Sequence, residues 1–361
     1  LTCAPGEEIY SLFGHTAIRY EDPANGIDAV FNYGLFSFNT PNFILRFSLG
    51  ETDYQLGATD YARFAAEYAF DGRSVWQQTL NLSKEEKAEL IRLLQENYLP
   101  ENRVYRYNFF YDNCATRPRD KIEESIDGKV IYPAEPQDGS LSFRDIVHQY
   151  CKGHPWARFG IDLCIGSEAD RPITQRQMMF APFYLMDAFA GAQIVHDSVQ
   201  RPLVSGKELI VDALPEEEEG GWMPTPFQCS LLLFILTAAA TIYSIRKRTG
   251  LWGVDLILFG AAGIVGCVLA FLALFSEHPA VSSNFLLLVF HPGQLLLLPY
   301  IIYCVRKGKK CWYLTLNLVV LTLFMVLFPL IPQRFDLAVV PLALCLLIRS
   351  ASNLILTSKK K

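Results

Sequence analysis

The C-terminal part of this chain is built mainly from long apolar runs, and these constrain its fold more than any other feature. Each run has about the 20 residues that a helix needs to cross the hydrocarbon core of a bilayer. The five runs are 227–245, 251–275, 285–304, 312–331 and 337–356. Because a spanning segment must satisfy its own backbone polar groups, we predict five transmembrane helices.

Basic residues occur in every second loop between these runs. They follow the first run at 246–248, the third at 306–310 and the fifth at 359–361, whereas the other two loops together contain only Arg334. Buried helices of a soluble core would not produce this alternation, which follows the positive-inside rule. We therefore expect a cytoplasmic C-terminus and place the first 225 residues outside the cytoplasm.

Three polar features lie within the predicted spans. His291-Pro292-Gly293-Gln294 interrupts the third run, and we interpret it as a kink with a hydrogen-bonded histidine. The alternative is a functional site, because ionisable residues inside membrane spans are often functional. Asp255 and Arg349 lie toward the inner ends of their spans, where we expect both side chains to snorkel.

The composition divides the chain into three parts. Residues 1–214 have the mixed charge and turn residues of a folded domain, 215–226 form an acidic linker, and 227–361 form the transmembrane domain. The net charge of -5 does not indicate nucleic acid as a partner. No signal peptide is visible at Leu1, and since an exported domain needs one, we expect that it was removed.

The first domain combines strand and helix patterns. Strands predicted at 16–20 and 28–33 flank a turn-rich segment with Asn-Gly, which predicts a β-hairpin with His15 opposite Asn32 or Tyr33.

Further along, a capping box at Ser83 predicts a helix over 84–97, and 175–189 is another helix candidate. Residues 35–58 are rich in Phe and Leu without periodicity; we interpret them as core, the alternative being an apolar flap that faces the bilayer. Few βαβ alternations occur, so we predict an α+β domain.

The strongest chemical signal is Cys114 in Tyr111-Asp112-Asn113-Cys114-Ala115, together with His15 upstream. Asp112 and Asn113 are good N-cap types, which predicts that Cys114 opens a helix running to Ile126. The helix dipole would favour a thiolate, the helix amides could hold an oxyanion, and a nearby imidazole could move the proton.

Each residue also has a structural interpretation. A single cysteine is more often buried core, and a single histidine more often a hydrogen-bonded core or surface residue. Arg117 and Arg119 could hold a donor phosphate, or could simply form a solvated basic helix face.

Several motifs resemble one family. A histidine on a strand, followed far downstream by Asn-Cys, resembles the circularly permuted NlpC/P60 branch of the papain-like thiol fold. More specifically, the chain resembles the Lnb family of lipoprotein N-acyltransferases, which pair a periplasmic domain with a transmembrane domain. The matching stretches are Leu1-Thr2-Cys3-Ala4-Pro5-Gly6-Glu7, Tyr10-Ser11-Leu12-Phe13-Gly14-His15-Thr16-Ala17, Val30-Phe31-Asn32-Tyr33-Gly34, Tyr111-Asp112-Asn113-Cys114-Ala115-Thr116 and Ala169-Asp170-Arg171-Pro172.

The resemblance implies a permuted papain-like periplasmic domain with Cys114 as nucleophile and His15 as base. It also implies a third, orienting residue, which hairpin geometry assigns to Asn32. Asn113, Arg117 and Arg119 are our candidate substrate-binding residues. The implied location is the bacterial inner membrane, and the implied partners are a membrane phospholipid as acyl donor and a diacylated lipoprotein as acceptor.

Other functions stay open at this point. The same fold could serve a hydrolase of peptidoglycan peptides or phospholipids, or a non-catalytic membrane-anchored binding module. Five spans favour an enzyme that handles lipids. The spacing of His148, Cys151, His154 and Cys164 fits no standard zinc pair, so we assign no metal or cofactor. A disulfide between Cys151 and Cys164 is an alternative, although we expect both thiols to be unpaired.

Overall fold

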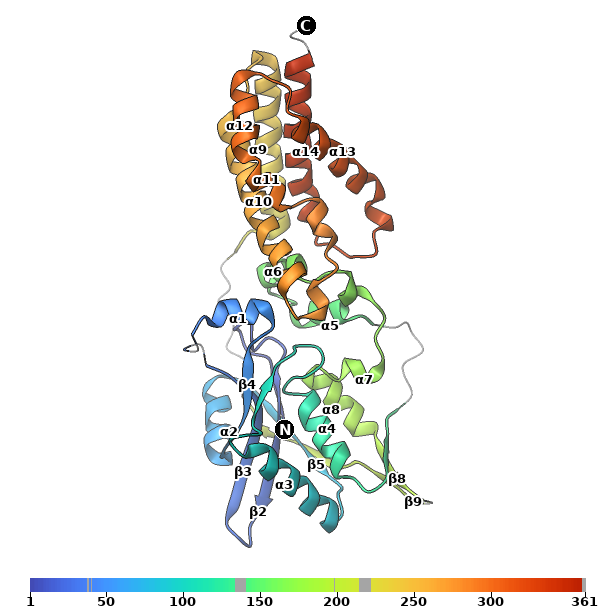
Figure 1. Ribbon diagram of the computed structural model, residues 1–361. Helices are drawn as coiled ribbons and strands as arrows, with labels where there is room; N and C mark the ends of the chain where they lie inside the picture. The colour runs from blue at the N-terminus through green and yellow to red at the C-terminus, as the bar shows by residue number, and fades with distance from the viewer. Residues whose placement is uncertain (38, 40, 134–140, 198, 214–221, 359–361) are drawn as a thin grey trace. The chain divides into compact units, whose positions relative to one another are not determined.

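The computed structural model describes residues 1–37, 39, 41–133, 141–197, 199–213 and 222–358 (Figure 1). The chain divides into two compact units. The first unit comprises Leu1–Cys151 and Pro172–Glu219, and the second comprises Lys152–Arg171 and Gly220–Lys361. The predicted first domain of 1–214 thus differs from the first unit, because Lys152–Arg171 packs with the apolar helices. Most of the predicted linker, 215–221, lies outside the described residues.

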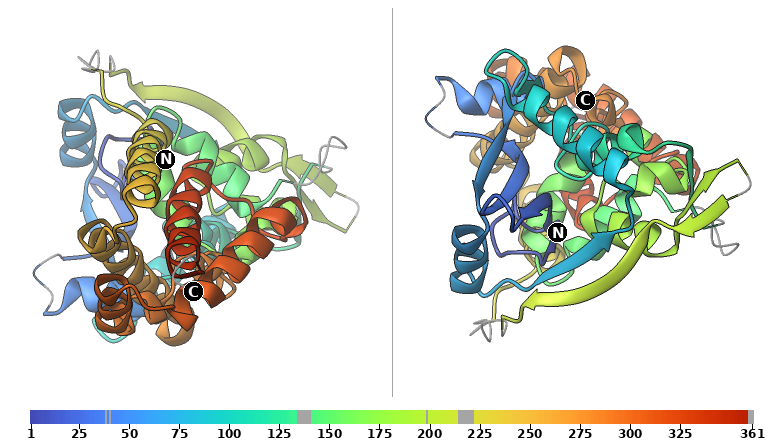
Figure 2. Two further views of the ribbon diagram at one scale, coloured as in Figure 1. Left: turned by 90° about the horizontal axis from the view of Figure 1, so that it is seen from above. Right: turned by 90° about the horizontal axis from the view of Figure 1, so that it is seen from below.

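The first unit is built on an antiparallel sheet of seven strands in the order β10-β5-β1-β2-β3-β4-β6. Strand β10 lies at one edge, paired with β5 (Figure 2). The bounds are β1 Thr2–Cys3, β2 His15–Asp22, β3 Ile27–Leu35, β4 Asp53–Asp60, β5 Val75–Leu80, β6 Val104–Arg106 and β10 Val204–Val211. A second antiparallel sheet contains β7 Lys129–Ile131, β8 Gln193–His196 and β9 Val199–Pro202.

Helices accompany these sheets, as expected of an α+β domain. They are α1 Phe43–Leu49, α2 Tyr61–Phe70, α3 Lys84–Tyr98, α4 Thr116–Ser125, α5 Phe143–Tyr150, α7 Gln175–Met178 and α8 Pro182–Gly191. The predicted capping box is present, because Ser83 Oγ accepts from the Glu86 N–H at 3.1 Å and Glu86 accepts from the Ser83 N–H at 2.7 Å. The helix predicted over 175–189 is instead two helices, since Pro182 begins α8.

The β2–β3 hairpin is present, but its register differs from the prediction. Ala17 pairs with Asn32, and Asp22 pairs with Ile27. The predicted pairing of His15 with Asn32 or Tyr33 is therefore wrong. Because side chains two residues apart share one face of a strand, His15 and Asn32 are diagonal neighbours on the same face.

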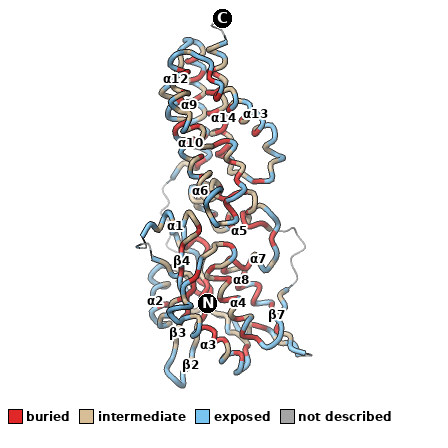
Figure 3. Tube along the Cα trace, in the orientation of Figure 1, coloured by how far each residue is buried: buried red, intermediate tan, exposed pale blue. Residues whose placement is uncertain are grey.

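Helix α1 corrects the interpretation of 35–58 as core. It contains no buried residue, and Ile44 is 81% exposed, so α1 is drawn only in tan and pale blue in Figure 3. Strand β4, from the same stretch, does enter the core through Tyr54 and Leu56. A mixture of an exposed apolar helix and a half-buried strand explains why the stretch shows no single periodicity.

Within its described residues, the second unit contains four helices that are long and apolar enough to cross a membrane: Pro226–Lys247, Trp252–Phe275, Trp312–Leu330 and Val339–Ser358. They correspond to α9, α10, α13 with the 3-10 turn η4 Phe328–Leu330, and α14. The prediction of five such helices is wrong for the third run. That run forms η3 Phe285–Leu288, α11 Pro292–Leu296 and α12 Leu298–Lys307.

The break occurs at His291, which has extended backbone angles (φ -141, ψ 153), as a residue before proline prefers. Its backbone packs directly on α10, where a Cβ on Gly266 would lie 2.4 Å from the His291 nitrogen. The His291 ring is hydrogen-bonded, with Nε2 3.1 Å from the Tyr313 hydroxyl. The predicted kink is therefore a full break between two short helices.

Segment Lys152–Arg171 is held to the rest of the second unit by polar contacts. It contains α6 Pro155–Cys164 and the 3-10 turn η1 Ser167–Asp170. Asn284 donates from Nδ2 to the Leu163 carbonyl at 2.7 Å, and Arg334 forms an ion pair with Asp170 at 2.9 Å. Gln333 also donates to the Ile165 carbonyl at 3.3 Å. These bonds explain why this segment belongs to the second unit, although the residues before and after it in the sequence belong to the first.

Candidate active site

Cys114 lies in the turn before α4, where β2 and β3 approach it. The backbone N–H groups of Thr16 and of Cys114 itself lie close enough to the thiol to favour its ionised form. On the other side, a Cβ placed on Gly34 would lie 3.5 Å from the Cys114 Cβ. Gly34 has a φ of +89, which L side chains rarely adopt, so a glycine lets β3 pass closely by the thiol.

His15 begins β2 and immediately precedes Thr16, so it enters the site with the strand that contacts the thiol. Its Nε2 lies 3.2 Å from the Oδ1 of Asn32, which is a buried side chain on β3. An amide oxygen accepts, so this contact requires a proton on Nε2 and leaves the Nδ1 lone pair available. The arrangement can hold a neutral imidazole with one nitrogen ready to accept a proton.

Burial sets the protonation states of the pair. It raises the pKa of the Cys114 thiol to about 11, although the two backbone N–H groups act in the opposite direction. It lowers the pKa of His15 to about 4, against the opposing effect of the Asn32 hydrogen bond. The resting pair at neutral pH is therefore a thiol and a neutral imidazole.

This result differs from the expectation of a thiolate at a helix N-terminus. Helix α4 begins at Thr116, and its N-cap is Ala115, so Cys114 precedes the helix. Burial outweighs the helix dipole and the N–H groups at this position. A nucleophilic role for Cys114 would therefore require a base that takes the thiol proton as the sulfur attacks.

Asn113 is a structural residue in this turn. Its Oδ1 accepts from the N–H groups of Ala115 and Thr116 at 2.8 and 2.9 Å. Its Nδ2 donates to the carbonyls of Phe109 and Phe180 at 2.8 and 2.9 Å. With its side chain fully bonded and only 3% of the residue exposed, it does not fit the predicted role in substrate binding.

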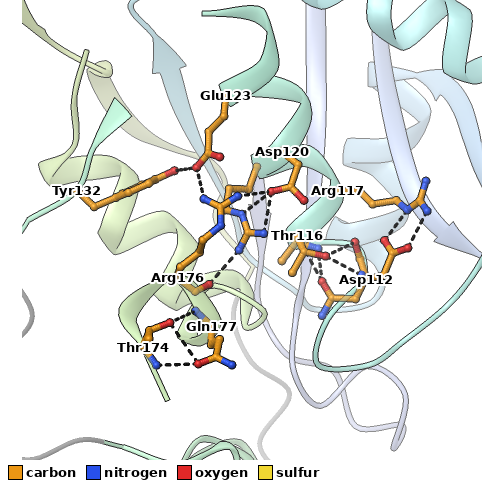
Figure 4. Close-up of polar contacts among 12 residues, drawn as sticks. Asp112, Thr116, Arg117, Asp120, Glu123, Tyr132, Thr174, Arg176 and Gln177 are labelled. Atoms are coloured by element: carbon orange, nitrogen blue, oxygen red, sulfur yellow. Dashed lines mark hydrogen bonds and ion pairs between the residues drawn. The ribbon is translucent and has the colours of Figure 1, made fainter. Parts of the chain in front are cut away.

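Arg117 is occupied by contacts within the protein. It forms a two-pronged ion pair with Asp112, at 2.6 and 2.7 Å (Figure 4). Its guanidinium also lies 3.6 Å from the centre of the Tyr105 ring. These contacts anchor the Cys114 turn to the neighbouring strand β6. Holding the turn, rather than binding a phosphate, is the role that they support.

Arg119 does not fit the predicted anion site either, because it is 6% exposed. It donates to the Arg176 carbonyl at 2.9 Å and to Asp120 at 2.8 Å. Arg176 in turn bridges Asp120 and Glu123, as Figure 4 shows. The group holds α4 against α7.

Tyr105 was missed by the sequence analysis, although it lies at the site. Its hydroxyl would be 3.9 Å from a Cβ on Gly34, the same position that lies beside Cys114. This hydroxyl is buried and has no hydrogen-bond partner within the described part of the chain. Burial raises the pKa of Tyr105, so the hydroxyl remains protonated and can donate to a bound substrate. A tyrosine in an aromatic strand gives no sequence signal for this role.

An exposed apolar surface leads away from the site, and we call it the α1 surface. It starts at Leu35, next to Gly34, and continues through the Phe36 ring, which stacks on Phe43 at 5.6 Å and meets Tyr10 at 5.9 Å. The exposed side chains of this surface are Ile9, Tyr10, Leu35, Ile44, Leu45 and Phe47. It adjoins, along the chain, the glycine that lies beside Cys114.

Among the residues that the structure describes, no three His, Cys, Asp or Glu side chains converge as a metal site would require. The candidate catalytic residues are Cys114, His15 and Asn32.

Comparison with known proteins assigns both parts of the chain. The family model of the Lnb N-terminal periplasmic domain matches residues 1–138, and that of the Lnb transmembrane domain matches residues 217–361. No match was found among curated proteins or among solved structures, so the permuted papain-like arrangement stays a prediction. With a periplasmic domain and a transmembrane domain of the same family in one polypeptide, this membrane protein belongs to the Lnb family.

Proposed function

We propose that this chain is a membrane-bound thiol acyltransferase that N-acylates the N-terminal cysteine of lipoproteins. The observation that carries the proposal is the convergence at Cys114: its thiol meets the N–H of Thr16, and the adjacent His15 is held by Asn32. A thiol, an imidazole and an amide that orients it form the catalytic set of papain-like enzymes. Membership of the Lnb family supports lipoprotein processing as the setting.

The first half of the reaction forms a thioester. The Cys114 sulfur attacks the ester carbonyl of a phospholipid while Nδ1 of His15 accepts the thiol proton. The N–H groups of Cys114 and Thr16 are suited to hold the oxyanion that develops. The intermediate then expels the lysophospholipid alcohol, which takes the proton from His15, and the acyl group remains on sulfur.

The second half transfers the acyl group to an amine. The α-amine of the lipoprotein cysteine attacks the thioester carbonyl, and the departing sulfur regains a proton through His15. The product is an amide, and Cys114 returns as a thiol.

The α1 surface supports an apolar substrate rather than a polar peptide. It presents aliphatic and aromatic side chains. The part of the chain that the structure describes also contains four helices long enough to span a bilayer. Tethering an enzyme to the membrane raises its effective concentration toward lipid substrates. Both features favour phospholipid and lipoprotein as the reacting partners.

The test combines cells and purified protein. We expect Cys114→Ala to abolish N-acylation of lipoproteins, measured by mass spectrometry of their N-terminal peptides, whereas Cys229→Ala on α9 leaves it unchanged. Wild-type protein incubated with phospholipid should gain one acyl group on Cys114 that hydroxylamine removes.

Two results would contradict the proposal. Normal N-acylation in cells that carry stable Cys114→Ala protein would exclude this cysteine as the nucleophile. Release of free fatty acid without transfer to an amine would instead identify a hydrolase.

A further inference from the structure

The second unit contains a cavity of about 330 Å³ among the ends of four helices. The end of α9, the start of α10, the end of α12 and the last turns of α14 supply its walls. The loop between α9 and α10 packs tightly here, since a Cβ on Gly250 would lie 2.7 Å from the Val305 carbonyl. Close backbone packing between this loop and α12 therefore forms one wall of the cavity. Its charged and hydroxyl-bearing lining residues include Arg248, Asp255, Arg306, Lys307, Arg349 and Ser352.

Two of the charged side chains in the cavity wall neutralise each other. Arg349 contacts Asp255 at 2.7 and 3.0 Å, and both side chains are buried. A third bond, at 3.2 Å, joins the guanidinium to Thr241. The expectation that Asp255 and Arg349 snorkel is thus wrong, because the two buried side chains pair with each other within the unit. This pair contributes no net charge to the cavity.

The other cations leave an excess of positive charge. Arg248, Arg306 and Lys307 are exposed and line the cavity, and none of them forms an ion pair with a carboxylate among the described residues. Arg306 also lies over the Trp252 ring, at 5.2 Å from its centre, which places its guanidinium near the start of α10. Helix α10 begins here without a capping side chain. Three cations and a helix N-terminus together favour an anion.

Ser352 gives an independent indication of a ligand. The residue is 1% exposed, it lines the cavity, and its Oγ has no hydrogen-bond partner within the described part of the chain. A buried hydroxyl that lacks a partner costs free energy, on the order of 1–3 kcal/mol in proteins. A phosphate oxygen would satisfy it.

We propose that this cavity binds the phosphate of an anionic phospholipid headgroup. Three of the helices that frame it, α9, α10 and α14, are long enough to cross a bilayer, so their ends lie where headgroups are found. Trp252 and Tyr303 are exposed aromatic residues at the same ends, as is typical of the membrane interface. Basic pockets between transmembrane helices are known binding sites for anionic lipids. The site is separate from Cys114 and does not depend on the proposed acyl transfer.

The simpler explanation of these cations is that they only orient the helices in the membrane. Arg246 and Lys247 provide the matched comparison, since they lie in the last turn of α9 and do not line the cavity. Neutralising them removes the same charge, but at the end of α9 instead of at the end of α12. The two explanations therefore predict different results for the two pairs of substitutions.

The experiment measures lipid binding to the full-length protein by native mass spectrometry in detergent. Phosphatidylglycerol, phosphatidylcholine and inorganic phosphate serve as three separate probes. We expect selective binding of phosphatidylglycerol, weakened roughly ten- to thirtyfold by Arg306→Gln with Lys307→Gln and less than twofold by Arg246→Gln with Lys247→Gln. Ser352→Ala, which changes no charge, should weaken binding several-fold and provides the test if the double variant fails to fold.

Three outcomes would overturn the proposal. Equal losses from the two double variants would show a general effect of surface charge. Equal affinity for phosphatidylcholine would show that the cavity does not select anionic lipid. Displacement of phosphatidylglycerol by millimolar inorganic phosphate would identify the ligand as soluble phosphate.

Discussion

The Nε2 atom of His15 lies 3.2 Å from the Oδ1 atom of Asn32, although the strand register places Ala17 opposite Asn32. Diagonal neighbours on one face of an antiparallel pair are within reach of long side chains. Asn32 can therefore fix the orientation of the imidazole from one side while the other ring nitrogen remains available. This makes Asn32 a positioning residue for the proposed base.

Substitutions of Asn32 should separate orientation from folding. We expect Asn32→Ala to lower kcat/KM roughly tenfold to a hundredfold, a part of what a general base contributes. Asn32→Asp should raise the pKa of His15, because a carboxylate favours the imidazolium, and so move the acidic limb of the pH–rate profile to higher pH. Asn25→Ala, in the exposed turn of the same hairpin, is the control. An unchanged acidic limb in Asn32→Asp would contradict the contact with the base.

The reactivity of Cys114 should follow its raised pKa. With a pKa of about 11, only a fraction on the order of 10⁻⁴ of the thiol is ionised at pH 7. Alkylation of Cys114 by iodoacetamide should then be slow at pH 7 and rise about tenfold per pH unit up to pH 9.5. Peptide mass spectrometry measures this cysteine separately from the others, with glutathione as the reference thiol. A rate that levels off below pH 8 would reveal an ionised, activated cysteine instead.

Tyr105→Phe should affect activity and stability in opposite directions. The substitution removes a buried hydroxyl that has no partner within the described part of the chain, so the melting temperature should stay equal or rise. If this hydroxyl donates to substrate, kcat/KM should fall roughly tenfold or more. Tyr33→Phe is the matched control, because it loses a 2.7 Å bond to Asn97 and should lower stability with little effect on activity. Full activity of Tyr105→Phe would exclude the donor role.

Arg117→Lys should act on stability. A lysine cannot reproduce both the two-pronged pair with Asp112 and the stacking on Tyr105, so we expect a loss of roughly 1–2 kcal/mol, measured as a lower melting temperature. The KM for phospholipid should stay nearly constant. Arg92→Lys, on the exposed side of α3, should change neither quantity. A raised KM without loss of stability would return Arg117 to the role of phosphate ligand.

Charges on the α1 surface should prevent access of lipid substrate. Ile44→Asp and Leu45→Asp replace exposed side chains, so thermal stability should change little, while activity on phospholipid vesicles should fall at least tenfold. Activity on a short-chain, water-soluble thioester should persist. Phe70→Asp is the control, since Phe70 is 90% exposed but lies at the end of α2. Equal losses on vesicles and on the soluble substrate would contradict a role in access.

Local sequence patterns predicted much of the fold, but they could not predict side-chain contacts between segments that are far apart in the sequence. The capping box at Ser83 and the hairpin of β2 and β3 follow from local chemistry, and both are present. The register differs from the prediction because turn-rich sequences fit more than one loop length. The proximity of Cys114 to Thr16 depends on packing between segments about 100 residues apart.

Two of the predicted substrate-binding residues are engaged by the protein itself, for one physical reason. Asn113 and Arg117 belong to residue types that bind substrates, yet here each finds its partners within the protein. Sequence gives the type of a side chain but not its nearest acceptor. For the same reason Tyr105, whose hydroxyl has no partner in the described part of the chain, could not be recognised in advance.

In the transmembrane part, too, the sequence alone did not reveal contacts between distant segments. Hydropathy located all five apolar runs, but length alone did not show that the backbone of His291 would pack on Gly266 and divide the third run. The Pro-Gly pair was a visible signal of an interruption. The full separation of the run into two helices depends on packing against α10.

The grouping of Lys152–Arg171 with the second unit has a practical consequence for protein engineering. A fragment cut at residue 214 would retain α6 without Asn284 and Gln333, leaving an unsupported helix prone to aggregation. Pro172 pairs with Ser142 at the start of α5, and Cys151 follows its end, so a helix of about 12 Å separates the two points. Replacing 152–171 with a Gly-Ser bridge of about six residues would cover that span, so that the first unit could be produced without the segment that packs with the apolar helices.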